Sequence, residues 1–272
     1  MTEAFHHLVR NGTEISVRVI RRKGRGEQVF FIHGWMHSAD RWLDLMRLFP
    51  SDADLLSVEL PGFGESTIKP TNAASIDLFS DVIEELVASF LKPGRKTSLV
   101  AHSLGGLLSL GFSKLVFDRT FYVAVPINGL SGAANLLGFE TLSVVGLSLN
   151  RMLPRKIETY FTTKSALLTV SDPECVDDLM IRDARRADVR VAARMAREIT
   201  QFRLHTALPC DKKSSFVVHG ENDQIVSETD SAELAEYCCA DLTVIPESGH
   251  TVMLEATAEL YAFIIQSAQC RK

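Results

Sequence analysis

Short runs of apolar and β-branched residues recur along the chain, separated by longer stretches with helical spacing. Six of these runs are Val29–Ile32, Leu55–Val58, Ser98–Val100, Phe121–Val125, Ser215–Val218 and Leu242–Ile245. Several are apolar without alternation, which is typical of strands covered on both faces. Before them, Ala4–Val9 and Glu14–Ile20 are predicted to form a hairpin, because Asn11 and Gly12 supply the positive φ angles of a tight turn. Strand–helix alternation requires right-handed crossovers and predicts an α/β fold, with a mostly parallel central sheet of about eight strands and flanking helices.

The alternation breaks in the middle of the chain. Residues 131–206 contain no convincing strand and show helical spacing in three parts, around 136–149, 157–168 and 176–204. This stretch is far longer than a crossover between two strands needs. The pattern therefore predicts one α/β core made of residues 1–130 and 207–272, with residues 131–206 inserted as a helical lid.

Composition narrows the class of protein. The chain has 272 residues, 46% hydrophobic and 23% charged, as expected of an ordinary globular protein. A net charge of −5 argues against a whole-protein role in binding nucleic acid. The five cysteines lack zinc-site spacing, the first residues are too polar for a signal peptide, and no run approaches the ~18 apolar residues of a membrane span. These features predict a soluble, reduced, cytoplasmic protein.

The strongest motif is a serine between a predicted strand and a predicted helix. The residues from Ala101 to Gly106 (AHSLGG) follow the strand Ser98–Val100 and precede an apolar helical run that starts at Leu107. A serine at such a turn is held in a strained backbone conformation that exposes its hydroxyl, and small residues on either side let neighbouring backbone approach. The pattern predicts that Ser103 is a nucleophile. The alternative is a structural serine in a glycine-rich turn.

A second motif, His33-Gly34-Trp35, follows the predicted strand Val29–Ile32. Cleavage of an acyl group creates an oxyanion, which two backbone N–H groups must stabilise. Leu104, directly after the serine, is expected to supply one, and Trp35 the other. His33 is expected to brace this loop by a hydrogen bond.

A serine nucleophile needs a base to take its proton and a carboxylate to orient that base. Asp223 lies in the loop after the strand Ser215–Val218, and His250 lies after the strand Leu242–Ile245. The order Ser103, Asp223, His250 is the order expected for this arrangement. Other acids compete for the middle role, namely Glu221, Asp230 and Glu247.

Taken together, these motifs resemble the α/β-hydrolase superfamily, in its serine esterase and lipase-like branch, over essentially the whole chain. That family carries an H-G-x loop beside G-x-S-x-G, followed by H-G-x-x-D-x-x-V and then G-H. The matching segments here are His33 to Trp35, Ala101 to Gly105, His219 to Val226, and Gly249-His250. Two departures are Ala101 at the first glycine and Glu59 where an aspartate is commoner, two residues before Pro61. The resemblance implies a hydrolase with a helical lid over its site and no metal or organic cofactor.

Comparison with particular enzyme groups of the superfamily narrows the reaction that the chain is expected to catalyse. Haloalkane dehalogenases and epoxide hydrolases place an aspartate where Ser103 stands, so the sequence disfavours those activities. The His33-Gly34-Trp35 loop and the segment from Leu60 to Ser66 are also similar to the carrier-protein methyl ester esterases of biotin synthesis, through short matches that many small-ester hydrolases share.

The segment 182–203 is rich in arginine on a chain that is acidic overall. On one continuous helix, five of its arginines would share an arc of about 120°, namely Arg182, Arg186, Arg190, Arg194 and Arg197. One interpretation is a solvated helix face. The other is a contact with an acidic carrier protein, an anionic substrate such as a phosphate-bearing coenzyme, or a membrane surface.

The combined prediction is a serine hydrolase that cleaves a small-molecule carboxylic ester or thioester through an acyl-enzyme. The same residues also suit an amidase, a carbon–carbon bond hydrolase or a perhydrolase, and a non-catalytic ligand receptor with this fold is a further alternative.

Overall fold

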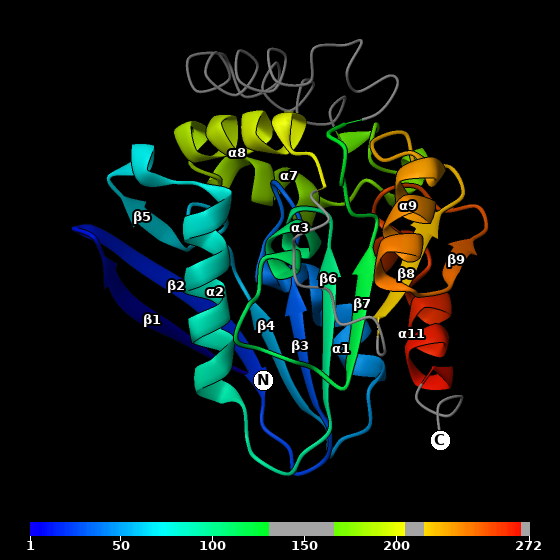
Figure 1. The fold of residues 1–272 in the computed structure, drawn as a ribbon, viewed down its shortest axis with the longest axis horizontal. Helices are drawn as coiled ribbons and strands as arrows, with labels where there is room; N and C mark the ends of the chain where they lie inside the picture. Colours follow the sequence, from blue (N-terminus) through cyan, green and yellow to red (C-terminus); the bar gives the residue numbers. More distant parts are fainter. Residues whose placement is uncertain (131–165, 205–214, 268–272) are drawn as a thin grey trace.

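The computed structural model describes residues 1–130, 166–204 and 215–267. About half of the predicted lid, including 136–149, lies outside the described residues, so the lid boundaries stay a prediction. The described residues form an α/β-hydrolase fold around a sheet of nine strands, as predicted for the class (Figure 1). The strands are β1 (Thr2–Arg10), β2 (Thr13–Arg22), β3 (Gln28–Ile32), β4 (Asp54–Val58), β5 (Thr67–Lys69), β6 (Thr97–His102), β7 (Arg119–Val123), β8 (Ser215–Gly220) and β9 (Leu242–Ile245).

The sheet order is β1-β2-β4-β3-β6-β7-β8-β9, with β5 beside β2. The six strands from β4 to β9 in this order run parallel, whereas β1, β2 and β5 make antiparallel pairs. Asn11 (φ 48°) and Gly12 (φ 77°) form the predicted hairpin turn between β1 and β2. The short strand β5 is not among the predicted strands, since three residues carry too little pattern to reveal a strand.

Helices cover both faces of the sheet, and β3 shows how the sequence specifies the two layers. Its alternate residues enter different cores: Phe30 and Ile32 pack toward one face, Val29 and Phe31 toward the other. The first face is covered by α2 (Ile76–Phe90), α3 (Leu104–Leu110) and α9 (Glu228–Cys238), and α8 (Val189–Gln201) packs onto the same core from beyond the carboxyl ends of the strands. The second is covered by α1 (Leu43–Leu48), α10 (Val252–Glu255) and α11 (Thr257–Gln266).

The arginine-rich segment folds as two helices, α7 (Asp178–Arg186) and α8, and not as one. The helical run ends at Ala187, and Asp188 starts the next helix by accepting hydrogen bonds from the backbone N–H groups of Arg190 (2.9 Å) and Val191 (3.2 Å). The expectation of a single basic helix face from Arg182 to Arg197 is therefore wrong. We call α7 and α8 the cap helices; they lie above the carboxyl ends of the parallel strands (Figure 1).

Two further sequence expectations concern cysteine chemistry and membranes. Cys238 is disulfide-bonded, whereas Cys175 and Cys239 are free, so the prediction of wholly reduced cysteines is wrong at Cys238. Among the helices that the structure describes, none is long and apolar enough to cross a membrane.

Candidate active site

Ser103 occupies the turn between β6 and α3 and has a conformation that few residues adopt. Its backbone has φ 50° and ψ −118°, and its N–H donates to the carbonyl oxygen of Val123 (2.9 Å) on the neighbouring strand. Backbone strain of this kind persists only where the surroundings hold it in place. Here Gly105 permits the turn, because a Cβ on it would lie 2.6 Å from the carbonyl oxygens of Ile32 and His33. The close packing of α3 on β3 thus fixes the position of the serine hydroxyl.

Three predicted residues meet at the carboxyl edge of the sheet. Ser103 Oγ lies 3.0 Å from His250 Nε2, and His250 Nδ1 lies 2.8 Å from Asp223 Oδ2. The other carboxylate oxygen of Asp223 accepts the backbone N–H groups of Ile225 (2.7 Å) and Val226 (3.0 Å). The carboxylate is fully buried and satisfied, so it presents one oxygen to the imidazole in a fixed direction. This geometry suits proton transfer from Ser103 to His250.

The acids that competed with Asp223 in the sequence have other contacts. Asp230 accepts a hydrogen bond from the Asn128 side chain (3.1 Å), and Glu221 accepts one from the backbone N–H of Glu247 (3.0 Å). Asp223 is the acid that the structure brings to the histidine.

The loop His33-Gly34-Trp35 packs directly against the serine. A Cβ on Gly34 would lie 3.0 Å from the Cβ of Ser103, so only glycine lets the loop come this close. His33 braces the loop as predicted: its Nδ1 donates to the carbonyl oxygen of Gly34 (2.7 Å) and its Nε2 accepts the backbone N–H of Leu60 (2.9 Å). Burial lowers the pKa of His33 to about 4, which agrees with a neutral ring that donates and accepts one bond each. The role of Trp35 and Leu104 as oxyanion donors stays a prediction.

The side chain of Trp35 has a contact that the sequence does not reveal. Its indole N–H donates to the carbonyl oxygen of Ala192 in α8 (2.9 Å). The loop expected to bind the oxyanion is therefore tied directly to a cap helix.

His102 is a second residue whose role the sequence missed. It is buried, and its Nε2 donates to the backbone oxygen of His250 (2.9 Å), with the two ring centres 4.8 Å apart. Burial, with His250 nearby, holds the pKa of His102 well below its usual value, so the ring stays neutral. His102 positions the loop that carries His250. Its place directly before Ser103 was the available signal.

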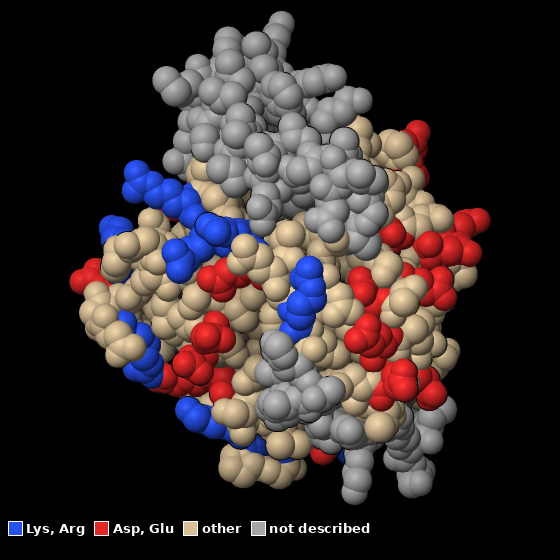
Figure 2. Space-filling model, turned by 45° about the horizontal axis from the view of Figure 1, so that its top comes forward, with Lys and Arg blue, Asp and Glu red and all other residues tan. Residues whose placement is uncertain are grey.

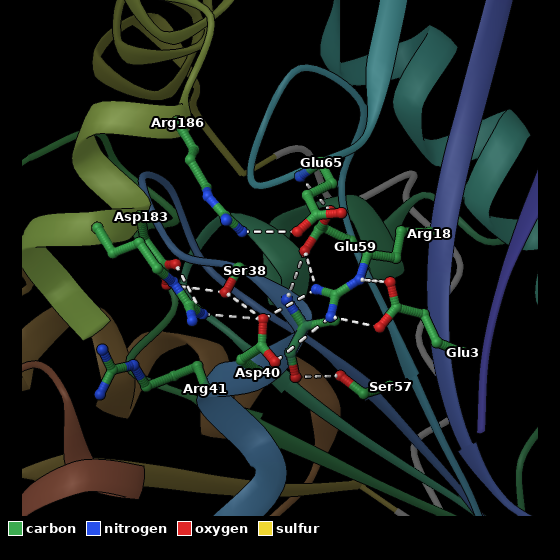
Figure 3. Close-up of polar contacts among 12 residues, drawn as sticks. Glu3, Arg18, Ser38, Asp40, Arg41, Ser57, Glu59, Glu65, Asp183 and Arg186 are labelled. Atoms are coloured by element: carbon green, nitrogen blue, oxygen red, sulfur yellow. Dashed lines mark hydrogen bonds and ion pairs between the residues drawn. The ribbon is translucent and has the colours of Figure 1, made fainter. Parts of the chain in front are cut away.

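A partly buried ion network supports the neighbouring loops (Figure 3). Arg18 on β2 binds Glu3 (2.8 Å), Asp40 (2.8 Å) and Glu59 (3.0 Å). Burial opposes the charge of Arg18, but hydrogen bonds to Glu3 and Asp40 outweigh it, so its pKa is raised. Glu59 also accepts the backbone N–H groups of Glu65 (2.7 Å) and Ser66 (2.9 Å). Glu59 thus holds the loop after β4 in place although the family more often has aspartate there.

The same loops hold α7. Arg41 binds Asp177, at the start of α7, through two hydrogen bonds of 2.9 and 3.1 Å, and Ser38 Oγ donates to Asp183 Oδ2 (2.9 Å). Two arginines of α7 pair with the core as well: Arg182 with Asp40 (3.0 Å) and Arg186 with Glu65 (2.6 Å). Arg182 and Arg186, which the sequence groups with a basic outer face, instead bind acids of the core beneath the cap. Figure 3 shows Arg186 reaching Glu65.

Comparison with known proteins agrees with this fold. The model of the alpha/beta hydrolase family matches residues 29–263, so the chain belongs to that family. Among curated proteins, it is 21% identical over 93% of its length to the chloroplastic protein PHYLLO of Arabidopsis thaliana. It is 24% identical over 86% of its length to the dihydrolipoyllysine-residue acetyltransferase component of the acetoin cleaving system of Pseudomonas putida. The chain spans 16% and 61% of the lengths of these two relatives.

Solved structures with the same fold include hydrolases of different kinds. A thermophilic esterase from Thermogutta terrifontis has a TM-score of 0.75 at 20% identity, covering 99% of this chain and 98% of the esterase. A variant of the meta-cleavage product hydrolase from Pseudomonas fluorescens IP01 has a TM-score of 0.71 at 19% identity, covering 97% of each chain. At these identities the likeness establishes the fold.

Proposed function

We propose that the chain is a serine hydrolase that cleaves a carboxylic ester or thioester through an acyl-enzyme intermediate. The observation that carries the proposal is the hydrogen-bonded series Ser103–His250–Asp223 at the carboxyl edge of the sheet. The chain also shares its fold with an esterase over nearly its full length. An ester or thioester is also favoured because an alkoxide or thiolate leaves more easily than an amine.

In the proposed reaction, His250 Nε2 takes the proton of Ser103 as the serine oxygen attacks the carbonyl carbon. The backbone N–H groups of Leu104 and Trp35 bind the resulting oxyanion. His250 then protonates the leaving oxygen or sulfur as the carbon–oxygen or carbon–sulfur bond breaks. A water molecule, deprotonated by the same histidine, attacks the acyl-serine. His250 then returns this proton to Ser103 Oγ as the serine–acyl bond breaks and the acid is released. Asp223 keeps the imidazole oriented through both steps.

Matched substrates test which bond is cut. We expect kcat/KM for p-nitrophenyl butyrate and for a butyryl thioester to exceed that for p-nitrobutyranilide by at least about 100-fold, or roughly 3 kcal/mol of barrier. A series of p-nitrophenyl esters from acetate to decanoate then reports the acyl length that the site accepts. Faster cleavage of the anilide, or of a β-diketone, would replace the esterase proposal by an amidase or a carbon–carbon hydrolase. No turnover of any of them would favour a ligand receptor.

A further inference from the structure

A groove lies on the side of α8 that faces away from the sheet. It has a volume of about 910 Å³ and runs between α8 and the turn η2 (Thr71–Ala73). Arg190, Arg194 and Arg197 line the helix side, and Thr71 and Asn72 line the other. Basic side chains gather at the upper left of Figure 2 with a few acidic ones among them, while acidic side chains predominate on the right of the same view. The groove is thus a concave basic site on a chain whose net charge is −5.

Internal contacts account for some of the charges in the groove. Glu198 also lines it, but its carboxylate accepts the first backbone N–H of α2, that of Ile76 (2.7 Å), and lies 3.8 Å from Arg194 Nε. Arg194 also donates to the carbonyl oxygen of Ala74. The side chains of Arg190 and Arg197 differ: neither guanidinium makes a hydrogen bond or ion pair with any residue that the structure describes. Toward the part of the chain that the structure describes, the donors of these two guanidinium groups are therefore unused.

The spacing of these two arginines suits an anion with more than one charged group. Seven residues separate Arg190 from Arg197, which places them on one face of the helix and about 10 Å apart along its axis. Their side chains are long enough to converge on a ligand between them. Arginine donates two parallel hydrogen bonds to a phosphate, and the hydroxyl and amide of Thr71 and Asn72 add polar groups on the facing wall.

We propose that this groove binds a small phosphorylated molecule through Arg190 and Arg197. A small molecule suits the site because walls on two sides enclose it, whereas the surface of an acidic protein would have to project into the hollow. The ligand would lie on the outer side of α8, and the inner side of the same helix holds Trp35 through Ala192. The groove is therefore distinct from the place where Ser103 acts, and it lies one helix away from it.

Calorimetric titration of the full chain with inorganic pyrophosphate, at constant ionic strength, tests the proposal without reference to hydrolysis. We expect saturable binding of one pyrophosphate per chain, weakened at least about tenfold in R190Q/R197Q. The control is R47Q, which removes an exposed arginine that pairs with Asp44 on α1, far from the groove in sequence and fold. R47Q should bind as the wild type does.

Three results would overturn the proposal: no saturable binding of pyrophosphate, equal affinity in R190Q/R197Q and wild type, or equal weakening of binding in R47Q. Binding of an acidic peptide without binding of pyrophosphate would assign the groove to a protein partner. Because the side chains of Arg190 and Arg197 have no partners among the described residues, the thermal unfolding temperature without ligand should not change in R190Q/R197Q. Equal thermal unfolding would confirm that loss of binding is not loss of fold.

Discussion

Replacing Ser103 with alanine is expected to lower kcat for the best ester substrate by at least about 10⁴-fold. The substitution removes the oxygen that would form the acyl-enzyme and leaves His250 with no hydroxyl at 3.0 Å. The fold should survive, since one oxygen is lost and the strained turn is held by the packing of β6, α3 and the His33 loop. Steady-state hydrolysis of a p-nitrophenyl ester, with thermal unfolding in parallel, measures both effects.

Ser109→Ala is the matched control. Ser109 is a buried serine of α3 whose hydroxyl donates to the carbonyl oxygen of Gly106 (2.8 Å) and has no contact with His250. We expect this variant to keep turnover within a few-fold of wild type, with a small loss of stability, about 1 kcal/mol, from the missing hydrogen bond. Equal turnover in Ser103→Ala and wild type would remove the serine from the reaction.

Replacing Asp183 with asparagine is expected to make the protein more stable above pH 7, by up to about 4 kcal/mol. Burial raises the pKa of Asp183 from 3.8 to about 7. Ser38 offers one hydrogen bond, and Arg41 and Arg182 favour the anion without cancelling the effect of burial. The folded protein therefore holds this proton more tightly than the unfolded chain does. Stability from this group is full below about pH 4, falls as pH rises, and levels off above about pH 7.

Urea unfolding of the wild type and Asp183→Asn at several pH values tests this sign. The free energy of unfolding of the variant should gain on that of the wild type by about 2 kcal/mol between pH 5.5 and pH 8. Asp177→Asn is a control of opposite sign, since the hydrogen bonds from Arg41 outweigh burial and lower the pKa of Asp177. Its loss of stability should shrink as the pH falls. Parallel curves for Asp183→Asn and wild type would show that Asp183 is ionised in the folded state.

Short-range patterns predicted the parts of the molecule that depend on local sequence. Eight of the nine strands and the hairpin turn follow from apolar runs and from Asn11 and Gly12. The meeting of Ser103, Asp223 and His250 follows from a general rule: each residue comes after a parallel strand, and such strands end at one edge of the sheet. The His33 brace followed in the same way from its place in the loop after β3.

Other contacts join residues that are far apart in the sequence and meet only in the folded chain. Arg18 is one of several arginines in its region, and nothing nearby shows that it meets Glu59, which is 41 residues away. The contact between Trp35 and Ala192 spans 157 residues. Asp188 is a local signal for the break between α7 and α8, because aspartate favours helix starts. The amphipathic spacing continues without interruption through Asp188, however, and on its own favours a single helix.

The most direct test of the central claim is covalent capture of the nucleophile with an alkyl fluorophosphonate, which transfers its phosphonyl group to an activated serine with loss of fluoride. Intact-mass and peptide mass spectrometry should find one phosphonyl group per chain, on Ser103, in step with loss of esterase activity. Ser103→Ala should take up none, while Ser109→Ala should be labelled at the wild-type rate. Loss of activity with Ser103 unmodified, or with the label on another residue, would contradict the assignment of Ser103 as the nucleophile.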